Sequence, residues 1–430
     1  MQEFSTKKGN WWALLPIAVF LLVYIGISLI FNDFYVMSVV VAFMIAILVA
    51  CLQNKKLKFD DKLSVMAKGV ADKNIVTMIL IFLSAGVFAG VLGREGAKAV
   101  ADLFLSFIPA NYSALVLFVV SCFVSTAMGT SCGTISVIAP ISLELAVITG
   151  GSLPLYVASV IGGAMFGDNL SFISDTTIAA TTTQGCKMKD KFKENFFIAL
   201  PAAILTMLIL TIIALTNQST NDYTPASINL WLLIPYVLVL VGGIIGINVF
   251  VILIVGILSA IAVKLTLGVE IISVISSMGG GASSMFEVIL VTMLVSMLSA
   301  LMREHGGFDA ILFGIKKVFK GKVGGQLGIS ALVSLMDVAT ANNTVAIVMS
   351  APIAKTISEE YGITNTKTAS LLDIFGSVIQ GVIPYGAQMV TAISLTNVQV
   401  GAVIPLIFYP YLLALSSIAF ILIPAFIKKK

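Results

Sequence analysis

Long apolar runs separated by short polar segments dominate the chain. Runs of about 20 apolar residues are typical of helices that span a bilayer. Such runs predict spanning helices at residues 11–30, 35–51, 75–92, 196–215, 230–247, 249–263, 286–302 and 402–427. Because no small-residue cleavage pattern follows the first run, we expect it to remain as an anchor.

Two longer blocks do not fit a single span. Residues 112–146 would form one helix of roughly 50 Å, which is too long for one crossing and too short for two. A break is therefore predicted at residues 128–134, MGTSCGT, which are poor helix formers. The second half repeats this pattern at residues 336–344, MDVATANNT. Non-helical backbone at membrane depth is tolerated where it lines a cavity, and its carbonyls suit a small cation.

The segment FGDNLSFISDTTIAATTTQGC, residues 166–186, places two carboxylates inside an apolar region. An isolated charge at membrane depth costs roughly 2.5–3.5 kcal/mol or more, so such residues usually bind an ion, transfer a proton or pair. In a continuous helix Asp168 and Asp175 would lie about 10 Å apart on one face. A break at residues 171–174 would bring them closer, and Gly381, Pro384 and Gly386 predict the matching break in the second half.

A hard monovalent cation such as Na⁺ prefers oxygen ligands, and the broken segments are rich in them. Asp168 and Asp175 are the predicted Na⁺ ligands, with helix N-capping as their alternative role. Asp337 and Asp373 are second-half ligands or caps. The full candidate set for cation or substrate binding is Thr130, Ser131, Asp168, Asn169, Ser171, Ser174, Asp175, Thr176, Asp337, Asn342, Asn343, Thr344, Asp373, Gln380 and Gln388.

Lysine placement orients the chain. Three lysine-rich connections, at residues 55–73, 187–193 and 316–322, are cytoplasmic by the positive-inside rule. Residues 217–229 contain no Lys or Arg and fit an external linker, and lysines near both termini place both ends in the cytoplasm. A first half at 1–216 and a second at 230–430 then have opposite orientations in the membrane.

A faint internal repeat supports two inverted halves. Arg94 and Arg303 are separated by 209 residues, and each precedes a glutamate. GTSCGTISVIAPI at 129–141 aligns with ANNTVAIVMSAPI at 341–353, a shift of 212 positions that we call the repeat offset. Inverted repeats are typical of secondary transporters, whose sites lie where interrupted helices of both repeats meet. We expect each Arg–Glu doublet to form an interfacial charge pair at a span end.

The first-half motif also resembles a known family. GGAMFGDNLSFISDTTIAATTTQGC followed by KMKDKFKEN is similar to the signature of the NhaC family of Na⁺/H⁺ antiporters, although Phe172 replaces the usual proline. The resemblance implies an inverted-repeat ion transporter with two broken or hairpin segments, a mobile transport domain against a scaffold, and a homodimer. Relatives in that family include exchangers of organic acids and amino acids.

Two transport hypotheses follow. The first is Na⁺/H⁺ exchange at the cell membrane, in which a desolvated carboxylate binds either cation and so couples them by competition. The alternative is Na⁺- or H⁺-coupled transport of a small organic acid or amino acid, for which Asn342, Gln380, Tyr385 and Gln388 offer hydrogen bonds. A channel is a further class. No nucleotide or zinc motif indicates an enzyme, no cofactor beyond Na⁺ is implied, and nucleic acid is not an expected partner.

Overall fold

The computed structural model describes residues 9–31, 36–172, 174–216, 229–245 and 247–427. Every regular element within these ranges is a helix, and no strand occurs there, which confirms the predicted all-α class. Most of the linker predicted at 217–229, the terminal lysines and the start of the 35–51 run lie outside the described residues.

The described part of the first half contains nine α-helices and two short 3₁₀ helices. They are η1 (Trp11–Leu14), α1 (Leu15–Phe31), α2 (Val39–Leu52), α3 (Phe59–Val70), α4 (Lys73–Phe107), η2 (Ala110–Tyr112), α5 (Ser113–Met128), α6 (Ser131–Thr149), α7 (Leu153–Leu170), α8 (Asp175–Gln184) and α9 (Met188–Thr216).

The second half follows a closely similar order. Its elements are η3 (Leu230–Leu233), α10 (Ile234–Ile244), α11 (Val249–Thr266), α12 (Ile271–Ser284), α13 (Phe286–Glu304), α14 (Gly307–Val318), α15 (Gly321–Thr340), α16 (Asn343–Tyr361), α17 (Asn365–Gln380), α18 (Ala387–Thr396), α19 (Val400–Val403), η4 (Ile404–Leu406) and α20 (Phe408–Ile427).

Many of these helices have the length and composition of membrane spans. Among the described residues seven are long and apolar enough to cross a bilayer, and an eighth results if the bent segment 387–406 is one span. Five shorter apolar helices, α1, α2, α5, α10 and α20 with their flanking residues, accompany them. The two pieces of the bent segment meet at 111°.

Helix ends recur at the repeat offset along the two halves. The left-handed residues Gly129, Gly150 and Gly185 have left-handed counterparts at 341, 362 and 397. The N-cap residues Thr130, Ser152 and Ser174 have N-cap counterparts at 342, 364 and 386, which lie at the same offset. The helices of the two broken segments therefore have their caps and left-handed residues at equivalent positions in both halves.

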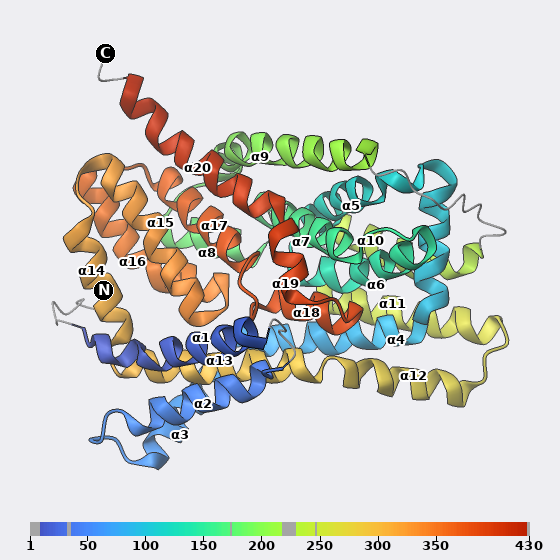
Figure 1. Ribbon diagram of the computed structural model, residues 1–430, viewed down its shortest axis with the longest axis horizontal. Coiled ribbons are helices and arrows are strands. Elements are labelled where there is room, and N and C mark those ends of the chain that lie inside the picture. Colours follow the sequence, from blue (N-terminus) through green and yellow to red (C-terminus); the bar gives the residue numbers. More distant parts are fainter. Residues whose placement is uncertain (1–8, 32–35, 173, 217–228, 246, 428–430) are drawn as a thin grey trace.

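The two halves place equivalent elements at opposite ends of the molecule. Helix α4 bends at Gly93, whose φ of 59° is left-handed, and the part after the bend stands at the right of Figure 1. Helix α14 stands at the left of the same view. The sequence predicts that this span ends at residue 92, but α4 continues through the bend to Phe107.

Other boundaries also differ from the predictions. The first break is narrower than 128–134, because only Gly129 and Thr130 separate α5 from α6. The last span begins at Phe408 rather than at residue 402, since η4 and α19 occupy the intervening segment. Helices α3, α12 and α14 have no counterpart among the predicted spans. Helices α3 and α14 are amphipathic, with polar residues on one side, and so lack the continuous apolar run used for prediction.

Helix α7 lies at the centre of the first half and is almost fully buried. Gly163 and Gly167 allow α5 to approach it closely: a Cβ atom on Gly163 would lie 2.3 Å from the carbonyl oxygen of Phe118, and one on Gly167 would lie 2.5 Å from that of Cys122. Small residues permit this kind of close helix packing in membranes. The packing fixes the end of α7, where the polar residues of the site begin.

Candidate functional site

The site forms where the helix breaks of both halves meet. Helix α7 ends at Leu170 and α8 begins at Asp175, as predicted, and α6 begins with Ser131 directly after the first break. Helix α16 of the second half packs against α8, and α18 packs against α6. Each break is thus faced by a helix from the other half, so the candidate residues come from both.

Asp168 is the buried carboxylate of the site. It lies in the last turn of α7 and is 3% exposed. The Ser174 hydroxyl donates to its Oδ1 at 2.7 Å, and the Ser131 hydroxyl donates to its Oδ2 at 3.0 Å. Ser174 Oγ also lies 2.8 Å from Thr176 Oγ1. Four predicted residues therefore form one buried cluster of a carboxylate and three hydroxyls.

Asp175 is the second carboxylate and connects the two halves. It opens α8 and is more exposed than Asp168. The Thr344 hydroxyl, in the first turn of α16, donates to its Oδ2 at 2.9 Å, and the Thr176 N–H donates to its Oδ1 at 3.1 Å. Asp175 directly follows Ser174, whose hydroxyl binds Asp168, so the two carboxylates lie on either side of the same break. The predicted approach of the two carboxylates across the break stays a prediction.

A chain of amides extends this cluster into the second half. The Gln388 amide donates to Ser131 Oγ at 2.9 Å, and the Gln380 amide donates to Gln388 Oε1 at 2.7 Å. The same Gln380 nitrogen donates to the carbonyl oxygen of Ala341, in the second break, at 3.1 Å. At the repeat offset Gln380 is the counterpart of Asp168, so one half has an acid where the other has an amide.

A third group surrounds a buried lysine. The Lys191 ammonium forms an ion pair with the Asp373 carboxylate, and both side chains are almost completely inaccessible. It also donates to the carbonyl oxygen of Asn169 and to Thr177 Oγ1, each at 2.8 Å. Asn195 donates to Asn169 Oδ1 at 2.6 Å and to Asp373 Oδ2 at 3.1 Å. This group adjoins Asp168 through Asn169.

Other candidates lie apart from these groups or have local roles. Thr130 and Asn342 cap the first turns of α6 and α16, and Asn343 accepts from the neighbouring Thr344 N–H. Ser171 follows the end of α7 and is buried, and it is not one of the Asp168 donors named above. Asp337 is fully buried, and neither carboxylate oxygen has a hydrogen bond within the described part of the chain.

The predicted Arg–Glu doublets do not pair within themselves. Arg94 instead binds Glu144 through two nitrogens, the shorter contact being 2.6 Å, and Glu95 pairs with Lys264 at 2.7 Å. Arg303 forms no ion pair among the described residues. The second half has no acidic residue equivalent to Glu144 with which Arg303 could pair, because the residue at the repeat offset is the uncharged Thr356.

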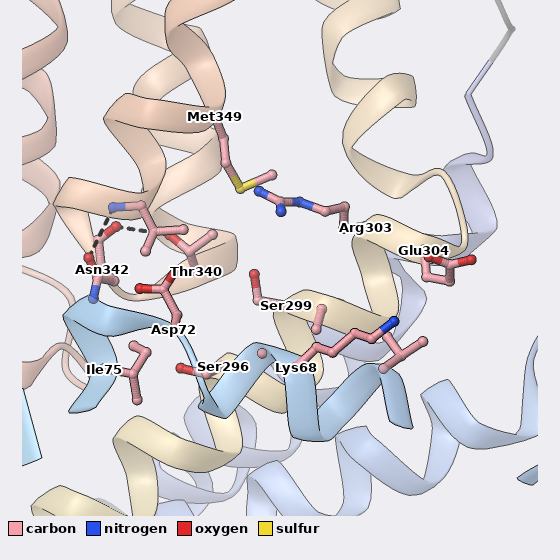
Figure 2. A pocket seen from close by; sticks show the side chains of 14 residues that line it. Lys68, Asp72, Ile75, Ser296, Ser299, Arg303, Glu304, Thr340, Asn342 and Met349 are labelled. Atoms are coloured by element: carbon pink, nitrogen blue, oxygen red, sulfur yellow. Dashed lines mark hydrogen bonds between the residues drawn. The ribbon is translucent and has the colours of Figure 1, made fainter. Parts of the chain in front are cut away.

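A cavity of about 260 Å³ lies beside Arg303 and reaches the second break. Figure 2 shows Arg303 extending from α13 toward Met349 of α16, while Asn342 and Thr340 form the opposite wall near Asp72. In the first half the equivalent helices α4 and α6 pack directly against each other. The cavity therefore approaches the site from the second half, because Asn342 in its wall lies two positions before Thr344 in the chain.

Comparison with known proteins identifies the family. The sequence profile described as "Na+/H+ antiporter family" matches residues 4–215 and again residues 214–426, which together include nearly the whole chain. The chain belongs to the Na⁺/H⁺ antiporter family. This confirms the resemblance to NhaC noted in the sequence and places the chain among multi-pass membrane transporters rather than enzymes.

Individual members of the Na⁺/H⁺ antiporter family show similarity at low identity. The Na⁺/H⁺ antiporter NhaC of Bacillus subtilis is 25% identical over 94% of this chain and 96% of its own length. The NhaC protein of Alkalihalophilus pseudofirmus is 21% identical over 93% and 94%. A malate-2H⁺/Na⁺-lactate antiporter of Bacillus subtilis is 25% identical, but the match spans only 53% of this chain and 52% of that protein.

Among solved structures, the YdaH transporter of Alcanivorax borkumensis matches with a TM-score of 0.42 and 16% identity. The match covers 80% of this chain and 85% of the YdaH chain. A likeness of this size adds nothing to the argument about the site.

Sequence reasoning about this family member missed Lys191, Asn195 and Thr177. Lys191 is grouped with the lysines that orient the chain, because its neighbours Lys187, Lys189 and Lys193 fit that role. One signal was available: Lys191 and Asn195 are four residues apart, so they share a face of α9, and that face turns inward. The charged residues on both sides of Lys191 in the chain concealed its burial.

Proposed function

We propose that this member of the family exchanges Na⁺ for H⁺ across the cell membrane, with both cations competing for Asp168 and Asp175. The observation on which this depends is the Asp168 carboxylate, buried at a helix break and bonded by hydroxyls of Ser131 and Ser174. Burial disfavours an uncompensated negative charge, so the carboxylate needs a proton or a metal cation. One bound cation excludes the other.

The hydroxyl partners suit both states of such a carboxylate. A serine or threonine hydroxyl can rotate, donating to an ionised carboxylate or presenting its oxygen to a cation. Ser131, Ser174 and Thr176 together supply three hydroxyl oxygens beside Asp168. Na⁺ would find oxygen ligands of the type it prefers, and a proton on Asp168 would find acceptors.

An inverted relation of the halves, with both termini and the lysine-rich connections in the cytoplasm, completes the proposal. It is supported by the helix ends that recur at the repeat offset and by the opposite placement of α14 and the second part of α4 (Figure 1). Lys68 and Asp72, in the lysine-rich connection, line the cavity of Figure 2. In this arrangement the cavity gives the site access to the cytoplasm.

A second candidate function is coupled transport of a small organic acid. Arg303 forms no ion pair within the described residues and lines a cavity of about 260 Å³, which favours a carboxylate-bearing solute, because guanidinium groups bind carboxylates bidentately. The malate-2H⁺/Na⁺-lactate antiporter among the relatives makes malate and lactate suitable probes. Asp72 and Glu304 also line this cavity, and their negative charges oppose binding of a dianion.

The test uses purified protein in liposomes containing a pH-sensitive dye. We expect added Na⁺ to drive proton efflux from the wild type, and Asp168→Asn or Asp175→Asn to reduce this flux at least ten-fold, which is about 1.4 kcal/mol. Asp190→Asn, an exposed aspartate at the start of α9, is the matched control and should transport normally. Flux of wild-type size in both site variants would contradict the assignment. Malate or lactate, added with and without Na⁺, tests the second candidate, which predicts a proton flux that depends on the organic acid.

A further inference from the structure

The surroundings of Lys191 have the composition of a cation site. Its ammonium contacts a carboxylate oxygen of Asp373, the carbonyl oxygen of Asn169 and the hydroxyl oxygen of Thr177. Carboxylate, carbonyl and hydroxyl oxygens are the groups that proteins use for hard cations. The ligands come from three separate parts of the fold, the end of α7, α8 and α17, as in an ion site assembled by tertiary structure.

The burial of this group requires a reason. Lys191 is 1% exposed and Asp373 is not exposed at all. A buried ion pair contributes little net stability, because the cost of removing both charges from water offsets their attraction, and apolar pairs of similar volume are often as stable. Structural need alone therefore does not explain a lysine here. The position of the lysine is more informative, because it contacts Asn169, which directly follows Asp168 in the chain.

Several polar atoms of the residues in this group have no partner. Asp373 Oδ1, Asn195 Oδ1 and Asn169 Nδ2 are buried and make no hydrogen bond within the described residues. Buried polar atoms without partners are uncommon in proteins. Two of these three are oxygen acceptors, so the region contains more oxygen ligands than the lysine uses.

We propose that Lys191 is a built-in cation that fills a second monovalent-cation site formed by Asp373, Asn169 and Thr177. The inference rests on the proposed function, which places the exchangeable ion at Asp168 and Asp175. The ammonium neutralises Asp373 permanently and prevents a second Na⁺ from entering. Lys191 thereby limits the transporter to one exchangeable Na⁺ per chain.

The experiment measures the number of Na⁺ ions bound per chain, with radioactive sodium on purified protein in detergent. We expect one ion for the wild type and two for Lys191→Ala, which removes the ammonium and leaves its oxygens. Lys191→Ala combined with Asp373→Asn should return the number to one, because the second site then lacks its charge. One ion bound by Lys191→Ala would overturn the proposal.

Folding of the variant offers an independent readout. Ammonium chloride should raise the unfolding temperature of Lys191→Ala but not of the wild type, because free ammonium can occupy the emptied site, and choline chloride should raise neither. The proposal requires that a bound cation can replace the lysine. A Lys191→Ala variant that stays unfolded in every salt therefore contradicts it.

Failure of the proposed function gives a different result. If Asp168→Asn still binds one Na⁺, the exchangeable ion is not at Asp168, whatever the effect of Lys191→Ala. The gain of one ion between the wild type and Lys191→Ala tests the lysine alone.

Discussion

The Ser174 hydroxyl occupies a central place among the individual groups of the site. It lies within hydrogen-bond distance of both Asp168 and Thr176, so it fixes the relative position of the carboxylate and the first turn of α8. A hydroxyl has one proton to donate and two lone pairs, which is enough for both contacts. Ser174 therefore positions Asp168, and under the proposed function we expect its oxygen to serve as a cation ligand.

Replacing this hydroxyl should weaken cation binding more than turnover. Ser174→Ala removes a hydrogen bond to a charged group, worth about 1.5–3 kcal/mol, so we expect the apparent affinity for Na⁺ to fall at least ten-fold. The control is Ser142→Ala, another buried serine, whose hydroxyl donates to the Ala139 carbonyl of its own helix. Na⁺-dependent proton flux measured over a range of Na⁺ concentrations gives both values. Equal affinities for the two variants would argue against a ligand role.

At this scale the sequence could predict the acids and the hydroxyl residues beside them, but not the lysine that pairs with Asp373. Asp168 and Asp175 stood out because charge is rare in apolar segments. The structure pairs Asp373, predicted as a ligand or cap, with Lys191, and a contact between residues so far apart in the chain leaves no local pattern. Asn342 caps α16 in the structure, and its predicted role in ion binding stays a prediction.

The site is built on the helix breaks. The two halves have different residues at the equivalent position that ends the helix before the break. Gly129 and Ala341 occupy equivalent positions, with left-handed φ values of 66° and 45°. Glycine adopts this conformation freely, whereas an alanine Cβ costs roughly 1–2 kcal/mol there. The second break is therefore strained at a position where the first is not.

Exchanging these residues should change stability in opposite directions. We expect Ala341→Gly to stabilise the protein by about 1 kcal/mol and Gly129→Ala to destabilise it by a similar amount. Thermal unfolding of both purified variants beside the wild type measures the difference. A loss of stability in Ala341→Gly would mean that the methyl group of Ala341 contributes packing that exceeds its strain.

The positions of the breaks could be predicted from sequence because glycine, serine and asparagine interrupt long apolar blocks. Their width could not, because Ser131 to Thr134 are poor helix formers alone but become helical once Thr130 caps them. The bend of α4 was missed for a related reason. Charged residues follow the apolar run directly after Gly93, so the sequence there resembles the end of a span. The chain instead bends at Gly93 and the helix continues.

The two halves of the molecule differ, within the described residues, in how their helices pack beside the breaks. A cavity separates α13 from the second break, whereas α4 packs on α6 in the first half, where Arg94 binds Glu144. Carriers with inverted repeats alternate such openings between the two sides of the membrane. Under the proposed function, we expect the described conformation to be one end of a transport cycle.

Side-specific labelling tests the proposed orientation of the chain in the membrane, in a background lacking Cys51 and Cys186. We expect Ser299→Cys, in the cavity wall, to react with an impermeant thiol reagent only from the cytoplasmic side. Asn229→Cys, at the last residue of the predicted external linker, should react only from outside. Labelling of both positions from one side would contradict the inverted arrangement.

The overall fold was largely predictable because apolar runs and their repeat depend on local sequence. The cavity beside the second break was not predictable, since it depends on packing between distant helices. The sequence predicted a pair of Arg94 with Glu95, whereas the structure pairs Arg94 with Glu144, whose counterpart at the repeat offset is the neutral Thr356.

The substitution of an acid by an amide at equivalent positions has a consequence for how symmetric the exchange can be. A duplicated ancestor with identical halves would have offered the same carboxylate to each side of the membrane. In this chain Asp168 lies in one half, and its counterpart in the other half is Gln380. The energy of the bound ion then differs between the two orientations of the site. We expect a rectifying exchanger, with unequal half-saturating Na⁺ concentrations on its two faces.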